Sequence, residues 1–124
     1  KSGVGTQLLD LLFLRISQIN GCAFCLDMHA RDLLKNGEDL QRVVSLDAWR
    51  DSDFYSPKER AALAWAEAVN ALDEHALDTA SAELKRHFNE REIAELSFAV
   101  ATINAWNMMN VSFRTAVERK PLAA

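Results

Sequence analysis

Apolar residues in this chain recur at the spacing of an α-helix, and this periodicity restricts the fold more than any other feature. In the segment TQLLDLLFLRISQI, for example, Leu8, Leu12 and Ile16 are each four positions apart. Such spacing lines one helix face with apolar groups, whereas a half-buried strand alternates apolar and polar residues. No segment alternates in that way, and helix breakers are few, with four glycines and two prolines. We therefore predict an all-α helix bundle.

Turn and capping signals predict where the helices begin and end. Asn20-Gly21 and Asn36-Gly37 are typical left-handed helix ends. The segment SPKE, residues 56–59, combines an N-cap serine, a proline suited to the first helical position and the glutamate of a capping box. The predicted helices cover residues 6–19, 22–35, 39–44, 57–71 and 79–88, and a long apolar helical stretch follows Asn89.

A faint internal repeat of two helices relates the start of the chain to its end. A shift of 84 positions places LFLRISQIN, residues 12–20, on LSFAVATIN, residues 96–104. The repeat allows a bend near Asn104, which would divide the last helical stretch into two helices. The cysteines of the first copy have no counterparts, because Trp106 and Met109 occupy their positions. Chance similarity between two apolar helices is the alternative explanation.

Charge and composition exclude several classes of partner. The chain has 14 Lys and Arg against 18 Asp and Glu, a net charge of −4, and its basic residues are scattered. This pattern lacks the basic surface needed to bind nucleic acid. The apolar run LLDLLFLRI is interrupted by Asp10 and Arg15 and is too short to span a bilayer. We expect one cytoplasmic domain over residues 1–124, with neither a membrane nor a nucleic acid as partner.

Both cysteines lie beside a histidine in the segment INGCAFCLDMHARDL. On a helix, Cys22, Cys25 and His29 share one face, and the first turn of a helix favours a thiolate through its unpaired N–H groups. A redox pair, a zinc site and simple packing all remain possible. A closed zinc site needs a fourth ligand, which neither His75 nor His87 offers at a suitable spacing. Packing requires no particular spacing of two cysteines and a histidine, so we favour redox chemistry.

The spacing suggests a separate role for each residue of the triplet. His29 is four positions after Cys25, so its imidazole can take the proton of that thiol as a general base. Cys25 is then the attacking thiol. After oxygen transfer from a peroxide it becomes a sulfenic acid, with which a neighbouring thiol condenses to a disulfide. Cys22 is positioned to be this resolving thiol, and no cofactor beyond the two sulfurs is expected.

The segment SQINGCAFCLDMHARDL resembles the core motif of the AhpD-like alkyl hydroperoxidase branch of the carboxymuconolactone decarboxylase superfamily. The later segments SPKERAALAWAEAVN and ELSFAVATINAWNMMNVSFR are also similar to that family, so the resemblance covers most of the chain. It implies a helix-bundle domain that forms homo-oligomers, commonly trimers or hexamers, with the thiol site near a subunit interface. It also implies reduction of alkyl or hydrogen peroxide, with electrons from a dithiol such as a lipoyl-bearing protein.

The chain departs from the resembled family at two positions. Family members usually have a glutamate twelve residues before the first cysteine, where it relays protons with the histidine, and this chain has Asp10 there. A carboxylate within an apolar helix suggests that Asp10 keeps this role, although its side chain is shorter; an exposed Asp near a helix start is the alternative. Some members also have a second histidine between the cysteines, where this chain has Ala23-Phe24. A weaker peroxidase is expected for that reason.

Aromatic residues outside the motif have two possible roles. Trp49, Phe54 and Tyr55 could line a substrate entrance, although aromatic residues in an irregular segment more often anchor it to the core. Trp106 and Met109, at helical spacing in the last stretch, are expected in the core or in an interface rather than in a cofactor site.

Overall fold

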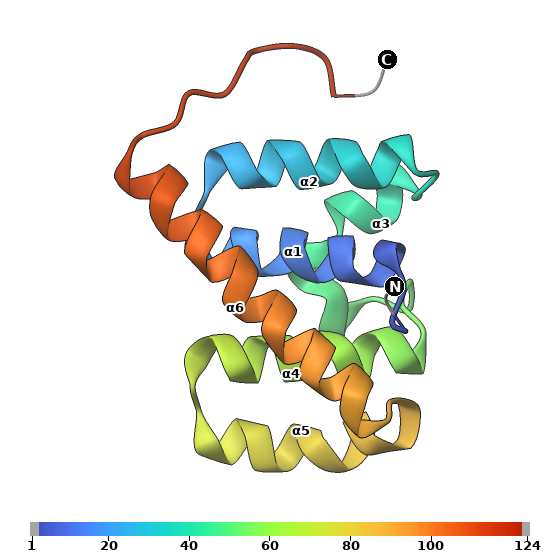
Figure 1. The fold of residues 1–124 in the computed structure, drawn as a ribbon. Helices are drawn as coiled ribbons and strands as arrows, with labels where there is room; N and C mark the ends of the chain where they lie inside the picture. Colours follow the sequence, from blue (N-terminus) through green and yellow to red (C-terminus); the bar gives the residue numbers. More distant parts are fainter. Residues whose placement is uncertain (1–2, 123–124) are drawn as a thin grey trace.

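The computed structural model describes residues 3–122, which fold into helices joined by short connections (Figure 1). The elements in chain order are α1 (Thr6–Asn20), α2 (Ala23–Lys35), α3 (Leu40–Val44), the 3-10 helix η1 (Leu46–Asp51), α4 (Pro57–Ala71), α5 (Glu74–His87) and α6 (Glu90–Ser112). No strand occurs within residues 3–122. The predicted all-α fold is therefore confirmed.

Helix α1 is at the centre of the fold and is covered on several sides. It packs against α2, α4 and α6, and α6 crosses the other helices diagonally in Figure 1. This central position explains why the segment LLDLLFLRI is apolar on nearly every side, since a helix with several buried faces cannot carry a polar face. Leu11, Leu12 and Ile16 are each at most 1% exposed.

The connection between α1 and α2 positions the cysteine motif. Gly21 ends α1 with φ 70° and ψ 38°, a left-handed conformation that glycine adopts without strain. Cys22 then has an extended conformation and serves as the N-cap, so α2 begins at Ala23, one position later than predicted. The glycine thus turns the chain so that the cysteines enter the first turn of a new helix, antiparallel to α1 (Figure 1).

Capping explains the observed bounds of α4 and α5. Ser56 and Glu59 form the predicted capping box, and α4 covers residues 57–71 as expected. Helix α5 begins at Glu74, earlier than the predicted start at residue 79, because the Asp73 side chain accepts a hydrogen bond from the Ala76 N–H.

Helix α6 is continuous, so the bend allowed near Asn104 does not occur. Asn89 and Glu92 cap its beginning, and its 23 residues continue through Asn104 to Ser112. Asn104 is followed by alanine, whereas its counterpart Asn20 is followed by the left-handed Gly21 that stops α1. The second copy of the repeat is therefore one helix rather than two. The two equivalent asparagines do meet, since Asn20 Nδ2 donates to Asn104 Oδ1 at 3.0 Å.

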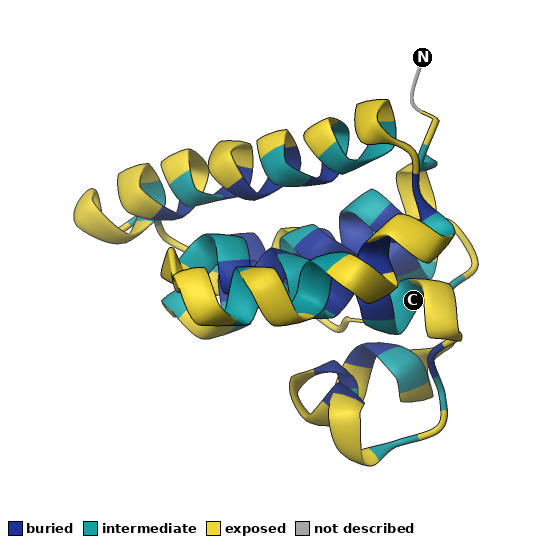
Figure 2. Ribbon diagram, turned by 90° about the horizontal axis from the view of Figure 1, so that it is seen from below, coloured by how far each residue is buried: buried dark blue, intermediate teal, exposed yellow. Residues whose placement is uncertain are grey.

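Buried faces of the helices turn toward one another, and exposed faces turn outward (Figure 2). Helix α6 has an unusual outer face, because several of its large apolar side chains are solvent-exposed. We call this set the α6 stripe; it comprises Phe98, Trp106, Met109 and Phe113, which are 75%, 59%, 48% and 71% exposed. Within residues 3–122, no helix combines the length and apolar character needed to cross a bilayer.

Candidate active site

Cys22 and Cys25 form a disulfide at the beginning of α2. Their Cα atoms are 5.2 Å apart, and the two residues are 1% and 0% exposed. The Cys25 backbone N–H donates to Cys22 Sγ at 3.2 Å, so a main-chain donor of the first helical turn contacts the first sulfur. The structure therefore brings the two predicted thiols together in a buried position.

His29 lies one turn after Cys25 on α2, with a buried ring and no hydrogen bond to either nitrogen. The residue is 8% exposed, and Nδ1 and Nε2 have no partner within residues 3–122. A buried polar group without a partner is costly, and such groups in native folds call for an explanation. Burial lowers the pKa of His29 below its ordinary value of 6.5, while the charge of Asp32 acts in the opposite direction. A neutral imidazole is the form that accepts a proton.

Asp10 is buried on α1, about one helical turn from the residue that contacts His29. The Phe13 and His29 rings are in contact, with centroids 5.2 Å apart. Asp10 precedes Phe13 by about one turn on α1, and Asp32 follows His29 by about one turn on α2. Both carboxylates are therefore further from the α1–α2 connection than the Phe13–His29 contact is. Since the helices are antiparallel, these steps run the same way, and the charge of Asp32 acts on both Asp10 and His29. Burial, and then the charge of Asp32, raise the pKa of Asp10.

A cavity of about 300 Å³ borders His29 between α1, α2 and α6. Most of its wall is apolar, while His29, Thr102 and Asn110 contribute the polar groups. The lining residues are Phe13, Phe24, Met28, His29, Thr102, Ile103, Trp106 and Asn110. A small, mostly apolar cavity with a few polar groups is the usual form of a small-molecule site.

Helix α6 contributes a row of asparagines that sequence reasoning missed. Asn107 donates to the Ser17 hydroxyl at 3.1 Å, and Asn110 Nδ2 lies 3.8 Å from Cys25 Sγ, within hydrogen-bond reach of sulfur. Asn104, Asn107 and Asn110 are three positions apart in an otherwise apolar helix. That regular spacing of amides was the available signal, because it places all three on neighbouring faces of one helix.

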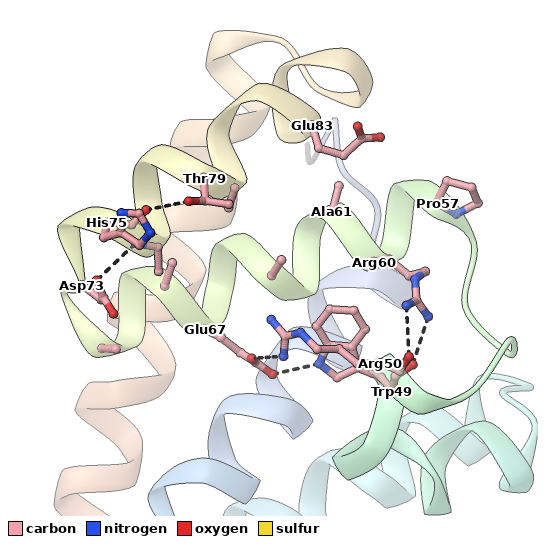
Figure 3. Close-up of a pocket in the computed structure, with 15 residues that line it drawn as sticks. Trp49, Arg50, Pro57, Arg60, Ala61, Glu67, Asp73, His75, Thr79 and Glu83 are labelled. Atoms are coloured by element: carbon pink, nitrogen blue, oxygen red, sulfur yellow. Dashed lines mark hydrogen bonds and ion pairs between the residues drawn. The ribbon is translucent and has the colours of Figure 1, made fainter.

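A larger groove lies elsewhere, between η1, α4 and α5, and Glu67, His75 and Glu83 are among the residues that line it (Figure 3). Its volume is about 980 Å³. Glu67 accepts hydrogen bonds from Trp49 and Arg50, while Arg60 donates to backbone carbonyls of residues 49, 50 and 52. These polar groups are satisfied within the fold, whereas the His29 nitrogens beside the small cavity have no partner within residues 3–122.

Trp49 and Tyr55 anchor the irregular segment instead of lining an entrance to the thiols. Both are 4% exposed, and the Tyr55 hydroxyl donates to the Arg42 carbonyl oxygen. Neither residue lines the cavity beside His29, so the observed burial and bonding favour the anchoring role over the suggested substrate entrance. Across residues 3–122, no group of three or more His, Cys, Asp and Glu side chains is arranged to hold a metal ion.

Comparison with known proteins identifies the family. Residues 1–68 match the model of the carboxymuconolactone decarboxylase family. An uncharacterized protein, YdfG of Bacillus subtilis strain 168, is 36% identical over 113 residues, which are 90% of this chain and 77% of the relative. The chain belongs to the carboxymuconolactone decarboxylase family. The family predicted from the cysteine motif is thus confirmed.

One solved structure supports the AhpD-like branch of this family. A protein of unknown function from Agrobacterium tumefaciens, described as a candidate antioxidant defence protein AhpD, superposes with a TM-score of 0.90 at 37% identity. The match covers 95% of this chain and 82% of that one. An uncharacterized peroxidase-related protein from Silicibacter sp. TM1040 has a TM-score of 0.80 at 20% identity, over 90% of this chain and 59% of that protein. The second likeness concerns the fold alone.

Proposed function

We propose that this protein is a thiol-dependent peroxidase that reduces alkyl or hydrogen peroxide through Cys22, Cys25 and His29. The observation that supports this proposal most directly is a buried cysteine pair one helical turn from an unpartnered histidine that borders a cavity. A peroxide in that cavity would give the buried imidazole the hydrogen-bond partner that it lacks. The resemblance of the motif to AhpD-like hydroperoxidases supports the same reaction.

The first step is oxygen transfer to Cys25. His29, held neutral by burial, takes the Cys25 proton and leaves a thiolate. The thiolate attacks one peroxide oxygen, so that an S–O bond forms and the O–O bond breaks. The alkoxide that leaves takes the proton back from the His29 imidazolium. Cys25 is then a sulfenic acid, and the peroxide has become an alcohol, or water if the substrate is hydrogen peroxide.

The second step closes the disulfide that the structure contains. The Cys22 sulfur attacks the sulfenic sulfur of Cys25, the S–S bond forms, and hydroxide leaves as water after taking the Cys22 proton. A dithiol or lipoyl-type reductant then opens this disulfide by exchange and is itself oxidised. Because both cysteines are at most 1% exposed, a slender dithiol arm is better suited to reach them than a broad protein surface. We place this cycle in the cytoplasm, where dithiol reductants are maintained.

Peroxide consumption with dihydrolipoamide as reductant tests the proposed reaction. We expect continuous turnover of an alkyl hydroperoxide that stops when the cysteines are alkylated. A protein whose disulfide opens and closes with dithiols, but which consumes no peroxide, would instead be a redox sensor or disulfide-exchange protein. A protein that binds about one zinc per chain and keeps both thiols unchanged by peroxide would be a metal-binding or structural member of the family.

Asp10→Asn is expected to stabilise the protein while slowing its reaction. The pKa of Asp10 is raised by burial, so the stability that its neutral form contributes is complete below the ordinary value of 3.8 and is lost as pH rises through the raised pKa. At neutral pH, asparagine avoids the cost of a buried carboxylate. We therefore expect a higher melting temperature at pH 7, no difference at low pH, and about tenfold slower turnover if Asp10 relays protons.

The control for Asp10 is Asp53→Asn, which changes an exposed carboxylate and should alter neither quantity. Peroxidase rates that are the same in wild type and Asp10→Asn from acid to neutral pH would rule out the relay. Asp10 would then be a buried acid with no part in the reaction.

We also propose that the protein is a homo-oligomer, a trimer or a hexamer, assembled through the α6 stripe. Phe98, Trp106, Met109 and Phe113 lie along one side of α6, and contiguous exposed apolar side chains of this kind mark interaction surfaces. Trp106 also lines the cavity beside His29. A neighbouring subunit that covers the stripe would therefore close over the cavity, as the family resemblance implies for a thiol site near an interface.

Phe98→Glu is expected to dissociate this oligomer. Phe98 is on the stripe and outside the cavity lining, so a charge there disrupts apolar contact between subunits without touching the thiols. Light scattering coupled to size exclusion should give the mass of three or six chains for wild type and a smaller mass for the variant. A wild-type mass of one chain, 13.9 kDa, would contradict the proposed assembly.

A further inference from the structure

Asn110 connects the far end of the chain with the reacting sulfur. It lies on α6, 85 positions from Cys25, and its Nδ2 is 3.8 Å from Cys25 Sγ. The same nitrogen donates to the Trp106 carbonyl oxygen at 2.9 Å, which fixes the amide against its own helix. Asn110 also lines the cavity that His29 borders. Asn110 therefore both borders the cavity and holds a hydrogen-bond donor against Cys25 Sγ.

Each sulfur of the disulfide has a donor of its own. Cys22 Sγ accepts the backbone N–H of Cys25 at 3.2 Å, whereas Cys25 Sγ is contacted by the Asn110 side chain. Within residues 3–122, Asn110 supplies the sole side-chain hydrogen bond to either sulfur. An amide has no charge to gain or lose between acid and alkaline pH, so this donor stays in place whichever way His29 is protonated.

We propose that Asn110 is a catalytic residue that stabilises the Cys25 thiolate and thereby makes Cys25, rather than Cys22, the attacking sulfur. This inference deepens the proposed peroxidase function and rests on it for the identity of the electrophile. When the thiolate forms, the amide N–H donates to a full negative charge, and such a bond is stronger than one to a neutral acceptor. When the S–O bond forms and the O–O bond breaks, the proton for the leaving alkoxide still comes from His29. Asn110 transfers no proton and supplies only its hydrogen bond.

The test measures the thiolate at Cys25 without peroxide. In a Cys22→Ser background, Cys25 is the single thiol, and its alkylation rate by iodoacetamide follows its thiolate fraction. We expect Asn110→Leu, which has similar volume and no donor, to slow alkylation at neutral pH about tenfold, equivalent to about 1.4 kcal/mol. The curve of alkylation rate against pH should shift to higher pH by about one unit, which corresponds to the same tenfold change. Asn110→Asp, which preserves the shape and reverses the electrostatic effect, should slow alkylation further.

Ser112→Leu is the matched control, because it replaces another polar residue near the end of α6 whose hydroxyl bonds only within that helix. It should leave the alkylation profile unchanged. If Asn110→Leu does not fold, as judged by its melting curve, Asn110→Asp alone decides the matter. Profiles identical to that of the background protein would overturn the role of Asn110, even if wild type reduces peroxide. A shifted profile in a protein that never consumes peroxide would instead support Asn110 and refute the peroxidase proposal.

Discussion

We expect Cys25→Ser to abolish peroxide turnover completely, and Cys22→Ser to stop after one reaction with a sulfenic acid trapped on Cys25. The first variant lacks the nucleophile, and a serine hydroxyl in the same place does not reduce a peroxide. The second variant keeps the nucleophile but lacks the thiol that closes the disulfide. Rapid mixing with an alkyl hydroperoxide, followed by mass spectrometry with a sulfenic acid probe, distinguishes the two outcomes.

A physical argument also exists for Cys22 as the attacking thiol, and the same two variants test it. Cys22 is the N-cap of α2 and accepts a main-chain N–H at 3.2 Å, and such a position also favours a thiolate. Cys25 has instead the Asn110 donor and a histidine one turn away on the same face. A sulfenic acid trapped on Cys22 in the Cys25→Ser variant, with no reaction in Cys22→Ser, would show that the helix N-terminus outweighs the side chains.

His29→Gln is expected to reduce peroxide turnover by a factor of about 100 or more, the usual contribution of a general acid–base residue. Glutamine can donate and accept hydrogen bonds but cannot exchange a proton with Cys25 or with the leaving alkoxide. The matched control is His87→Gln, because His87 lies near the surface and contacts Glu83 at 3.1 Å. Steady-state rates of the three proteins, measured with one alkyl hydroperoxide, provide the comparison.

The pH dependence of the wild-type peroxidase rate also tests His29 as the base, and the lowered pKa of His29 predicts the direction of the effect. Burial lowers the pKa of His29, so the imidazole stays neutral, and able to take a proton, at pH values below its ordinary value of 6.5. The rate should therefore persist below pH 6.5 and fall only as pH drops through the lowered pKa. This acid limb should be missing in His29→Gln. A variant with the full rate and the same acid limb would exclude His29 as the base.

Much of this fold was predictable because local signals agree with the tertiary structure. Ser56 and Glu59 determine the start of α4 through bonds within a few residues, and Gly21 determines the end of α1 through its own conformation. The triplet of Cys22, Cys25 and His29 was predictable for the same reason, since its geometry lies within one helical turn or two. Signals of this kind do not depend on what the rest of the chain does.

The remaining features depend on which helices pack together. Nothing near Asp10 in the sequence indicates that the charge of Asp32 raises its pKa, because that effect arises from the packing of α1 against α2. Asn110 similarly meets Cys25 only after α6 crosses the bundle. The repeat was misleading at Asn104 because similar apolar faces recur in α1 and α6, while the glycine that breaks α1 has no counterpart in α6.

The measurement that tests the central claim most directly is a free-thiol count by mass spectrometry on metal-free, reduced protein. The count is made before and after about one equivalent of alkyl hydroperoxide, and again after a dithiol is added. A peroxidase of the proposed kind should lose both thiols as one Cys22–Cys25 disulfide and regain both with the dithiol. Two thiols that remain free in the presence of the peroxide would contradict the proposed function.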